Sequence, residues 1–270
     1  MRSNYRQFGL RRAEIKMLRF YCLVVFSIFL IIYYILKADY YVRHEDKYDE
    51  YERYSLALDI IHDVKKRGRI STVSYGEEKL PKDGGYVMYA NHQGKYDALG
   101  IMDSHKEPCS VIMDAERSKM PLADQVMSLV DGVRLDRTDF HKQVKALKKM
   151  TEDVKGGRRF IYFPEGGYRR NGNKLQDFLP GAFKVAKNAG VPIIPVALYD
   201  SHLPFDYNSY RKVTTQVCFM DPIYYEEYAD MSTKEISELV KARIEEKLDE
   251  LEENRRNNGW NMWVPKYKNC

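Results

Sequence analysis

His92 and Asp97 stand five positions apart in the segment NHQGKYD, residues 91–97, and this pair could perform acid–base chemistry. A histidine titrates near neutral pH, so its imidazole can take a proton from an alcohol. An aspartate that accepts a hydrogen bond from the other ring nitrogen fixes the tautomer and stabilises the imidazolium that forms. Taken alone the pattern is weak, because many surface histidines have an aspartate nearby by chance.

The elements around this segment predict where it lies in a fold. Residues 86–90, YVMYA, are typical of a buried strand, and strand and helix signals alternate from residue 70 onward. This alternation predicts an α/β sheet covered by helices, whose ligands bind beyond the strand ends, where His92 would lie. Strands are expected at residues 70–75, 85–90, 109–113, 130–135, 159–163, 191–198 and 213–219, and helices at 139–155, 181–188 and 232–254.

Three of these elements carry local signals. Ser232 and Glu235 form a capping box at the start of the closing helix. Pro192 and Pro195 remove backbone donors from the strand at 191–198, which predicts an edge strand or a bulge. The apolar face of the helix at 139–155 is expected to contain Phe140, Val144, Leu147 and Val154.

The net charge of +5 lies within the first 19 residues, which carry six basic residues and one acidic residue. A nucleic-acid-binding protein more often spreads a basic stripe over its folded domain, so this distribution argues against a nucleic-acid partner. A basic arm beside an apolar run instead suits anionic lipid headgroups. The four cysteines are widely spaced and form no C-x-x-C pair, which argues against a disulfide framework and fits a reducing compartment.

Residues 20–36 form an apolar run of seventeen residues without a charge. No small-residue cleavage site follows, which argues against a signal peptide. As one helix the run would be roughly 25 Å long, which is marginal for a hydrocarbon core of about 30 Å. By the positive-inside rule a spanning helix would keep the basic arm in the cytoplasm and put the rest of the chain outside. A spanning helix and a helix embedded from one side are both open interpretations.

A second, amphipathic helix is expected from residue 38 to about Gly68, because this stretch is rich in tyrosine and charge and lacks proline. Tyrosine suits a membrane interface, although a helix packed on the globular domain would show the same pattern. We therefore divide the chain into residues 1–68, a basic arm with membrane-embedded or interfacial helices, and residues 69–270, a globular domain.

Three further blocks place charged side chains or prolines at strand ends. Residues 132–137 read GVRLDR, residues 163–170 read FPEGGYRR, and residues 191–196 read VPIIPV. Together with the His92 segment, and in this order, they resemble the glycerolipid acyltransferase family, specifically the 1-acylglycerol-3-phosphate acyltransferases. That family carries NHxxxxD, a block like GxxFIDR, then FPEGTRS, then a VPIIPV-like stretch. The resemblance covers about residues 70–220.

The resemblance implies a fold and a reaction. The fold would be a mixed, largely parallel α/β sheet of the glycerol-3-phosphate acyltransferase type, preceded by an N-terminal membrane-anchoring helical segment. A fatty acyl group would pass from acyl-CoA or acyl-ACP to the free hydroxyl of 1-acylglycerol 3-phosphate, giving phosphatidic acid. His92 would be the general base and Asp97 would orient it, without a metal or a cofactor.

The same resemblance implies which residues bind the substrate. Arg137 matches the family's phosphate-contacting arginine, and arginine suits phosphate because its planar fork donates two hydrogen bonds at once. Glu165 and Gly166 match the family's Glu-Gly pair, and Lys95 is a second cation within the first motif. The expected substrate-binding residues are Asn91, Lys95, Arg137, Glu165, Gly166, Gly167 and Arg169.

One departure from the family pattern lies in the third block. Where the family has Thr-Arg-Ser after Glu-Gly, this chain has Gly167-Tyr168-Arg169. The expected arginine is a tyrosine, and Arg169 follows one place later. A one-residue shift reverses a side chain's direction in an extended segment, although a glycine-rich loop can compensate. Another lysophospholipid or glycerol 3-phosphate therefore stays open as the acceptor.

Two interpretations of a different class also stay open. The chain could be a membrane-surface lipid-binding protein with an inactive site, or a metal hydrolase built on His92 and Asp97, for which the sequence offers no third ligand. Because the acyl donors of the family are cytosolic, the resemblance implies that the domain at 69–270 lies on the cytoplasmic side of the membrane. We therefore expect the N-terminal helices to embed in one leaflet without crossing it.

Overall fold

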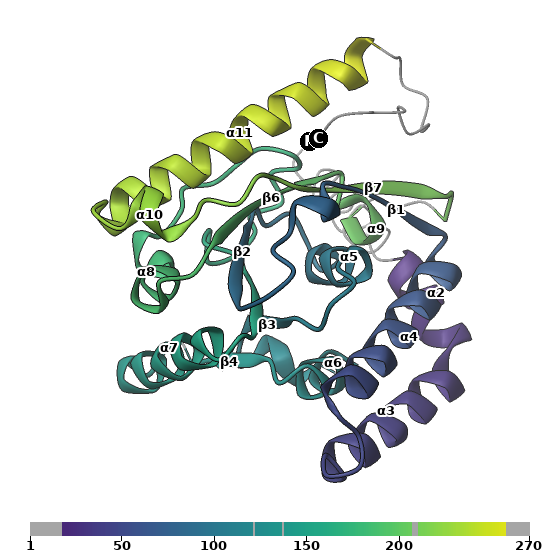
Figure 1. Cartoon of the computed structure of the whole chain (residues 1–270). Helices are drawn as coiled ribbons and strands as arrows, with labels where there is room; N and C mark the ends of the chain where they lie inside the picture. Colours follow the sequence, from purple (N-terminus) through teal and green to yellow (C-terminus); the bar gives the residue numbers. More distant parts are fainter. Residues whose placement is uncertain (1–17, 121, 137, 207–209, 258–270) are drawn as a thin grey trace, which may run out of the picture.

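A computed structural model describes residues 18–120, 122–136, 138–206 and 210–257 of the chain (Figure 1). Within these residues seven strands form one sheet in the order β1-β7-β6-β2-β5-β3-β4. The strands from β6 to β4 are all parallel, whereas β7 pairs antiparallel with β6 and parallel with β1. The predicted mixed, largely parallel sheet is confirmed. The strands are β1 (Ile70–Tyr75), β2 (Tyr86–Ala90), β3 (Ser110–Asp114), β4 (Val133–Leu135), β5 (Arg159–Tyr162), β6 (Ile193–Tyr199) and β7 (Val213–Phe219).

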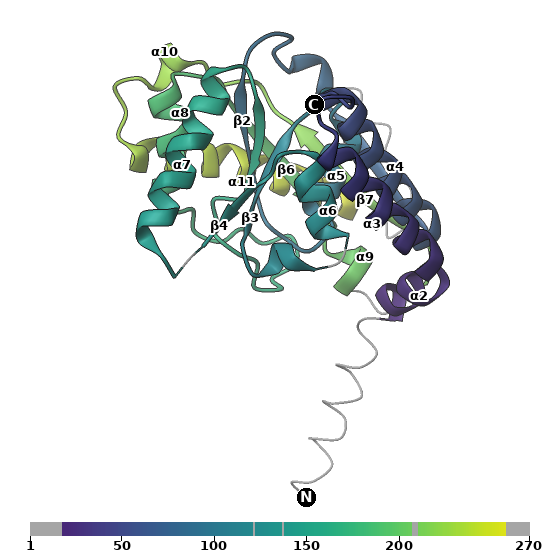
Figure 2. The ribbon, with the colours of Figure 1, turned by 90° about the horizontal axis from the view of Figure 1, so that it is seen from below.

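Helices cover both faces of this sheet, as Figures 1 and 2 show. Strand β2 is buried throughout because its alternate side chains enter two different hydrophobic clusters, Met88 on one face and Val87 and Tyr89 on the other. A strand buried on both faces is apolar without alternation, which is the pattern of residues 86–90. One face carries α4 (Glu50–Gly68), α5 (Asp97–Ser104) and α6 (Ala123–Leu129), and the other carries α7 (Phe140–Lys155), α8 (Lys184–Ala189) and α11 (Thr233–Asn257).

The shorter elements lie in the connections between the longer ones. Helix α9 follows β6 and α10 precedes α11, and three 3-10 helices complete the described chain. The capping box predicted for α11 is confirmed, because the Ser232 N–H donates to Glu235 Oε2 at 2.7 Å and the Glu235 N–H donates to Ser232 Oγ at 3.3 Å. These elements are α9 (Leu203–Asp206), α10 (Tyr225–Tyr228), η1 (Glu77–Lys79), η2 (Arg117–Lys119) and η3 (Pro180–Phe183).

The apolar run of residues 20–36 does not form one helix. It is divided at Ser27 between α2 (Leu18–Phe26) and α3 (Ile28–Arg43). Helix α3 also takes in residues 38–43, which the sequence analysis assigned to the second helix. No helix among the described residues is long and apolar enough to cross a membrane.

The tyrosine-rich second helix begins later than predicted and packs on the sheet. It is α4, and it starts after Asp49, whose side chain accepts from the Glu52 N–H at 2.8 Å in a capping box. Its buried residues join the same hydrophobic cluster as β2 and α5, so α4 belongs to the core of the molecule. Helices α2 and α3 lie against α4, and α3 also contacts α6.

Two further expectations need correction. Phe140 and Val144 are 72% and 49% exposed, because only the C-terminal half of α7 reaches the core, through Met150 and Val154. Strand β6 is not an edge strand, since β7 and β2 flank it. Its pairing with β7 does contain a bulge, because two residues separate Ile193 from Val196 while three separate their partners Phe219 and Ile223. Pro195 lies within this bulge.

Gly76 provides a test of how β1 is joined to the rest of the sheet. Its φ is +81°, and a Cβ there would lie 2.0 Å from the backbone oxygen of Phe219. Gly84 is a matched control, since its φ is +80° and a Cβ would meet nothing within 4 Å. We expect Gly84→Ala to lower the free energy of unfolding by about 1 kcal/mol and Gly76→Ala by about 2 kcal/mol more, as measured by urea denaturation. Equal losses would contradict the close approach.

Candidate active site

The segments after three neighbouring parallel strands meet at one edge of the sheet. Strand β5 pairs with β2 on one side and with β3 on the other. The His92 turn follows β2, the Glu165 loop (residues 163–179) follows β5, and η2 follows β3. Because adjacent parallel strands end side by side, residues distant in the sequence come together at this edge.

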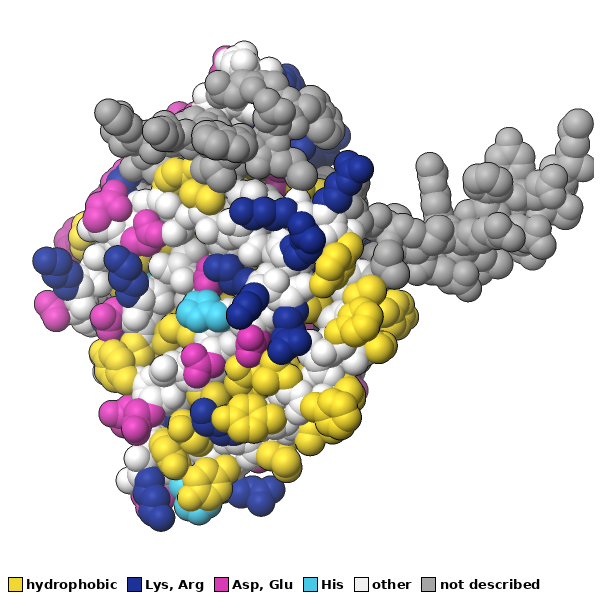
Figure 3. All heavy atoms as spheres, turned by 90° about the vertical axis from the view of Figure 1, so that its right-hand side faces the viewer, with side chains coloured by type: hydrophobic (Ala, Val, Ile, Leu, Met, Phe, Trp, Pro, Cys, Tyr) yellow, Lys and Arg dark blue, Asp and Glu magenta, His cyan; other side chains and the backbone are white. Residues whose placement is uncertain are grey.

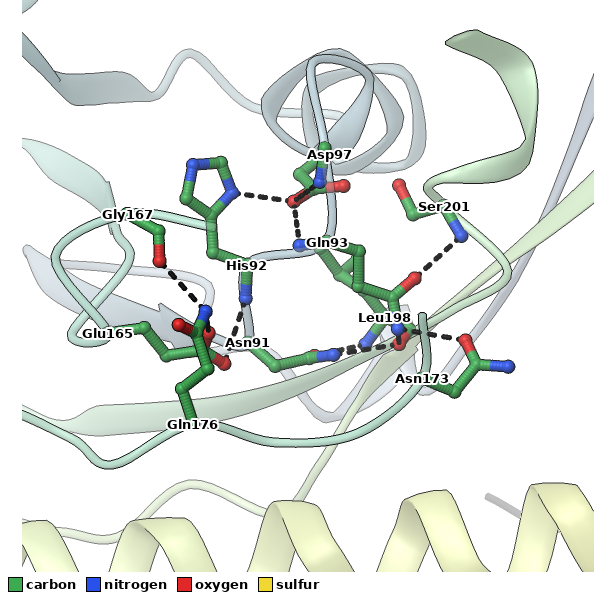
Figure 4. Close-up of polar contacts among 11 residues, drawn as sticks. Asn91, His92, Gln93, Asp97, Glu165, Gly167, Asn173, Gln176, Leu198 and Ser201 are labelled. Carbon is green, nitrogen blue, oxygen red and sulfur yellow. Dashed lines mark hydrogen bonds and ion pairs between the residues drawn. The ribbon is translucent and has the colours of Figure 1, made fainter. Parts of the chain in front are cut away.

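The buried carboxylate of Asp97 holds the His92 turn together (Figure 4). Its Oδ2 accepts hydrogen bonds from His92 Nδ1 at 2.7 Å and from the backbone N–H groups of Gln93 and Gly94 at 2.5 and 2.9 Å. Its Oδ1 is buried and has no hydrogen-bond partner among the described residues. Asp97 also begins α5, where the helix dipole favours a negative charge. Since Nδ1 donates to the carboxylate, Nε2 is the nitrogen that can accept a proton.

Two aromatic rings fix the orientation of the His92 imidazole. Phe163 stacks on it with centroids 4.5 Å apart and planes inclined by 23°, and Tyr168 meets it edge to face at 5.0 Å and 78°. The His92 side chain keeps 18% of its surface exposed. Figure 4 shows its second ring nitrogen pointing away from Asp97 and the other hydrogen-bonded residues. A substrate hydroxyl can therefore reach Nε2 while the rest of the ring is held.

Asn91 is placed in the core, although we expected it to contact substrate. Its Nδ2 donates to the Leu198 carbonyl at 3.0 Å, and its Oδ1 accepts from the Leu198 N–H at 2.7 Å. Both polar atoms of the side chain thus serve the backbone of β6, and the residue is 2% exposed. Asn91 joins the start of the His92 turn to the neighbouring strand.

A chain of hydrogen bonds links the residue after His92 to the closing helix. Gln93 Nε2 donates to Asn173 Oδ1 at 2.9 Å, and Gln93 Oε1 accepts from the Ser201 N–H at 2.8 Å. Asn173 Nδ2 donates to Asp200 Oδ1 at 2.9 Å, and Arg255 on α11 donates to both Asp200 oxygens at 2.9 and 3.1 Å. None of these residues stands out in the sequence, because no local sequence pattern connects polar side chains that lie 80 or 55 positions apart.

Glu165 connects the His92 turn to the loop after β5. Its Oε1 accepts the His92 backbone N–H at 3.1 Å, and its Oε2 accepts from the Gln176 side chain, which also donates to the Gly167 carbonyl at 2.8 Å. Burial raises the pKa of the Glu165 carboxyl, while these hydrogen bonds act in the opposite direction. Gly166 has a φ of +69°, and a Cβ there would lie 2.9 Å from Leu179 Cδ1. The loop conformation thus requires glycine at this position.

The structure describes two of the three cationic residues that we expected to bind substrate. Lys95 and Arg169 are exposed, in the His92 turn and in the Glu165 loop respectively. Arg137 lies outside the described residues. The phosphate contacts expected of these three residues therefore stay predictions. Within the described residues no group of three or more His, Cys, Asp or Glu side chains could hold a metal ion.

Comparisons with known proteins agree with this geometry. A family model described as acyltransferase matches residues 71–199, which include the His92 turn and the Glu165 loop. The chain resembles acyltransferases over the region that forms the site. This similarity supports an O-acyltransferase enzyme.

Individual known proteins resemble this chain in sequence or in fold. It is 28% identical over 170 residues to a 1-acyl-sn-glycerol-3-phosphate acyltransferase of Salmonella typhimurium, across 63% of this chain and 69% of the relative. It is 35% identical over 124 residues to a chloroplastic 1-acyl-sn-glycerol-3-phosphate acyltransferase of Brassica napus, across 46% of this chain and 36% of the relative. The crystal structure of the 1-acyl-sn-glycerophosphate acyltransferase from Thermotoga maritima shows the same fold, with a TM-score of 0.69 at 21% identity over 90% of this chain and 97% of that one.

Asp97→Asn tests the orienting role of the buried carboxylate. We expect kcat for acyl transfer to fall by about 10²- to 10⁴-fold, because a neutral amide cannot stabilise the imidazolium and can present its own N–H to His92. Asp103→Asn is a matched control, since Asp103 lies on the same helix, is nearly buried, and pairs with Lys65 instead of His92. This control should change the free energy of unfolding and leave kcat close to that of the wild type. An unchanged kcat for Asp97→Asn would show that the pair is not catalytic.

Proposed function

We propose that this chain transfers a fatty acyl group from acyl-CoA or acyl-ACP to the free hydroxyl of 1-acylglycerol 3-phosphate, giving phosphatidic acid. The observation that carries the proposal is the 2.7 Å hydrogen bond from His92 Nδ1 to the buried Asp97, which leaves Nε2 as the accepting nitrogen. The names of the Salmonella and Brassica relatives, which specify this acceptor, support it. Glycerol 3-phosphate or another lysophospholipid is the alternative acceptor, because Tyr168 stands where the family has an arginine.

The proposed reaction needs only the residues of the His92 turn and the two substrates. Nε2 of His92 takes the proton of the acceptor hydroxyl while the hydroxyl oxygen bonds to the carbonyl carbon of the thioester. The carbon–sulfur bond then breaks, and the departing sulfur takes the proton from the imidazolium as a free thiol. Asp97 stabilises the imidazolium between these steps. We propose that no metal or cofactor takes part, since the acyl thioester is a substrate.

An exposed apolar surface on α2 and α3 supports a membrane-bound enzyme. Figure 3 shows hydrophobic side chains gathered on the side of the molecule that these helices cover. Exposed apolar patches of this kind mark contact sites for membranes or proteins. We call it the α2–α3 surface; its members, each at least 44% exposed, are Tyr21, Val25, Phe26, Ile28, Phe29, Ile32, Tyr33, Leu36 and Tyr40.

Basic side chains adjoin the α2–α3 surface and favour a membrane as its partner. Arg69 and Arg211 are exposed. They lie close together because the Val213 N–H donates to the Arg69 carbonyl at 3.1 Å. Arg19 of α2 donates to the Arg211 carbonyl at 2.6 Å, which brings the start of α2 beside them. Basic residues near an anionic bilayer contribute about 1 kcal/mol each. We propose that α2 and α3 embed in the cytoplasmic leaflet of the cell membrane without crossing it, so that the site faces cytosolic thioesters.

Product analysis tests the proposed reaction. Purified wild-type protein, mixed acyl thioesters and a panel of lysophospholipids and glycerol 3-phosphate should yield phosphatidic acid as the main product, identified by mass spectrometry. His92→Ala should lose nearly all acyl transfer and still fold, with a lower thermal unfolding midpoint because the buried Asp97 carboxylate loses one of its three hydrogen bonds. Formation of another phospholipid instead would change the acceptor but keep the reaction class.

Vesicle flotation tests the membrane surface. We expect the charge-introducing variant Phe29→Asp to lose most of its binding to vesicles of phosphatidylcholine with phosphatidylglycerol, because Phe29, at 86%, is the most exposed of the named members of the α2–α3 surface. Phe140→Asp is the control, since Phe140 is also exposed, at 72%, but lies on α7 at the opposite side of the molecule (Figure 1). Equal binding by both variants would argue against this surface as the membrane contact.

A further inference from the structure

We propose that Arg117, seated on the ring of Tyr168, recognises the acceptor's phosphate beside His92. The inference rests on the proposed function, in which the acceptor carries a phosphate next to the reacting hydroxyl. It assigns the phosphate contact to a residue outside the family's sequence blocks. It also gives a role to the tyrosine that replaces the family's arginine in the Glu165 loop.

Three side chains form a row that leads outward from the catalytic base. The Tyr168 ring meets the His92 ring with centroids 5.0 Å apart, and the Arg117 guanidinium carbon lies 5.8 Å from the centroid of Tyr168. A guanidinium within about 6 Å of an aromatic centroid is attracted by the ring's quadrupole. Tyr168 therefore holds Arg117 one side chain away from the His92 ring.

The order of the strands explains why Arg117 can occupy this position. It belongs to η2, which follows β3, and only β5 lies between β3 and β2. The arginine expected from the sequence, Arg137, follows β4, which is one strand farther from β2. A side chain at the end of β3 thus starts closer to the His92 turn than one at the end of β4.

Tyr168 can donate a hydrogen bond, and Arg117 beside it is free of carboxylate partners within the described residues. Burial raises the pKa of Tyr168, and so do the charges of Asp206 and Asp97, while Arg117 and Arg170 oppose the rise. The phenol therefore stays protonated at neutral pH and can donate a hydrogen bond. Among the described ion pairs of η2, Lys119 is bound to Glu116, whereas Arg117 has no carboxylate partner within the described residues. Its guanidinium is exposed and available to a ligand.

The chemistry of the acceptor requires a cation close to His92. In a 1-acylglycerol 3-phosphate the reacting hydroxyl and the phosphate are on adjacent carbon atoms. A hydroxyl within hydrogen-bond reach of Nε2 therefore brings the phosphate close to the His92 ring, which Tyr168 contacts. Tyrosine cannot neutralise a phosphate, but the Arg117 fork next to it can donate two hydrogen bonds at once.

Steady-state kinetics with two acceptors test this assignment. The acceptors are 1-acylglycerol 3-phosphate and the matching monoacylglycerol, which lacks the phosphate, with acyl-CoA as the donor. We expect Arg117→Ala to raise KM for the phosphate-bearing acceptor about 10- to 100-fold, as loss of a charge-assisted hydrogen bond does. Neither kcat nor KM for acyl-CoA should change appreciably, and the monoacylglycerol rate should stay as in the wild type. Arg117→Lys should recover part of the loss, because it restores the charge without the planar fork.

Matched variants separate the role of Arg117 from general effects. Lys119→Ala removes a cation from the same short helix and should leave every parameter unchanged, since Lys119 is paired with Glu116. Tyr168→Leu should reproduce the acceptor KM effect of Arg117→Ala by removing the ring that seats the guanidinium, whereas Tyr168→Phe should keep most of the affinity. In Arg117→Ala the salt dependence of the acceptor KM should also be weaker than in the wild type.

Two outcomes would overturn the inference. One is an unchanged acceptor KM in Arg117→Ala, and the other is a rise in KM for acyl-CoA instead, which would assign Arg117 to the donor. Failure of the proposed function gives a different result, because the wild type would then transfer no acyl group to 1-acylglycerol 3-phosphate. If the wild type prefers glycerol 3-phosphate, the same variants are compared with that acceptor and with glycerol.

Discussion

The site depends on the hydrogen bonds that the buried carboxylate of Asp97 accepts. A buried charge is tolerated only when hydrogen bonds replace its hydration, and the ring N–H of His92 and two backbone N–H groups of the same turn supply them. The bonds that stabilise the charge thus also shape the turn and orient the imidazole. Local structure and catalytic geometry follow from one carboxylate at the start of α5.

The sheet then holds this turn against segments that are remote in sequence. Asn91 and Gln93, which flank His92, both bond to the Leu198 carbonyl on β6, at 3.0 and 2.8 Å. Glu165, after β5, accepts the His92 backbone N–H. The two strands that flank β2 therefore anchor the turn, while Nε2 of the imidazole is left for substrate. Arg117, in the helix η2 that follows β3, lies over the ring of Tyr168 at the same end of the sheet.

Most of the sheet could be predicted because its strands are continuous apolar stretches between turn signals, and their expected bounds differ from those observed by a few residues. Helices α5 and α6 were missed, since eight and seven residues are too short for a helical period to stand out. The break at Ser27 was missed for another reason: the residue is uncharged within an apolar run, and contacts with α4 and α6 decide where that run bends. The exposure of Phe140 depends on how far α7 extends past the core.

The sequence by itself determined the contact between His92 and Asp97 and the order of the site's segments. A spacing of five residues within one turn keeps the side chains of His92 and Asp97 close together, so local geometry is sufficient to bring them into contact. Only the tertiary structure decided that Asn91 faces β6, that Gln93 is tied to α11 through Asn173 and Asp200, and that Arg117 stands over Tyr168. Each of these contacts joins residues more than fifty positions apart, directly or through the chain of bonds, and the sheet's strand order, which no local pattern encodes, brings them together.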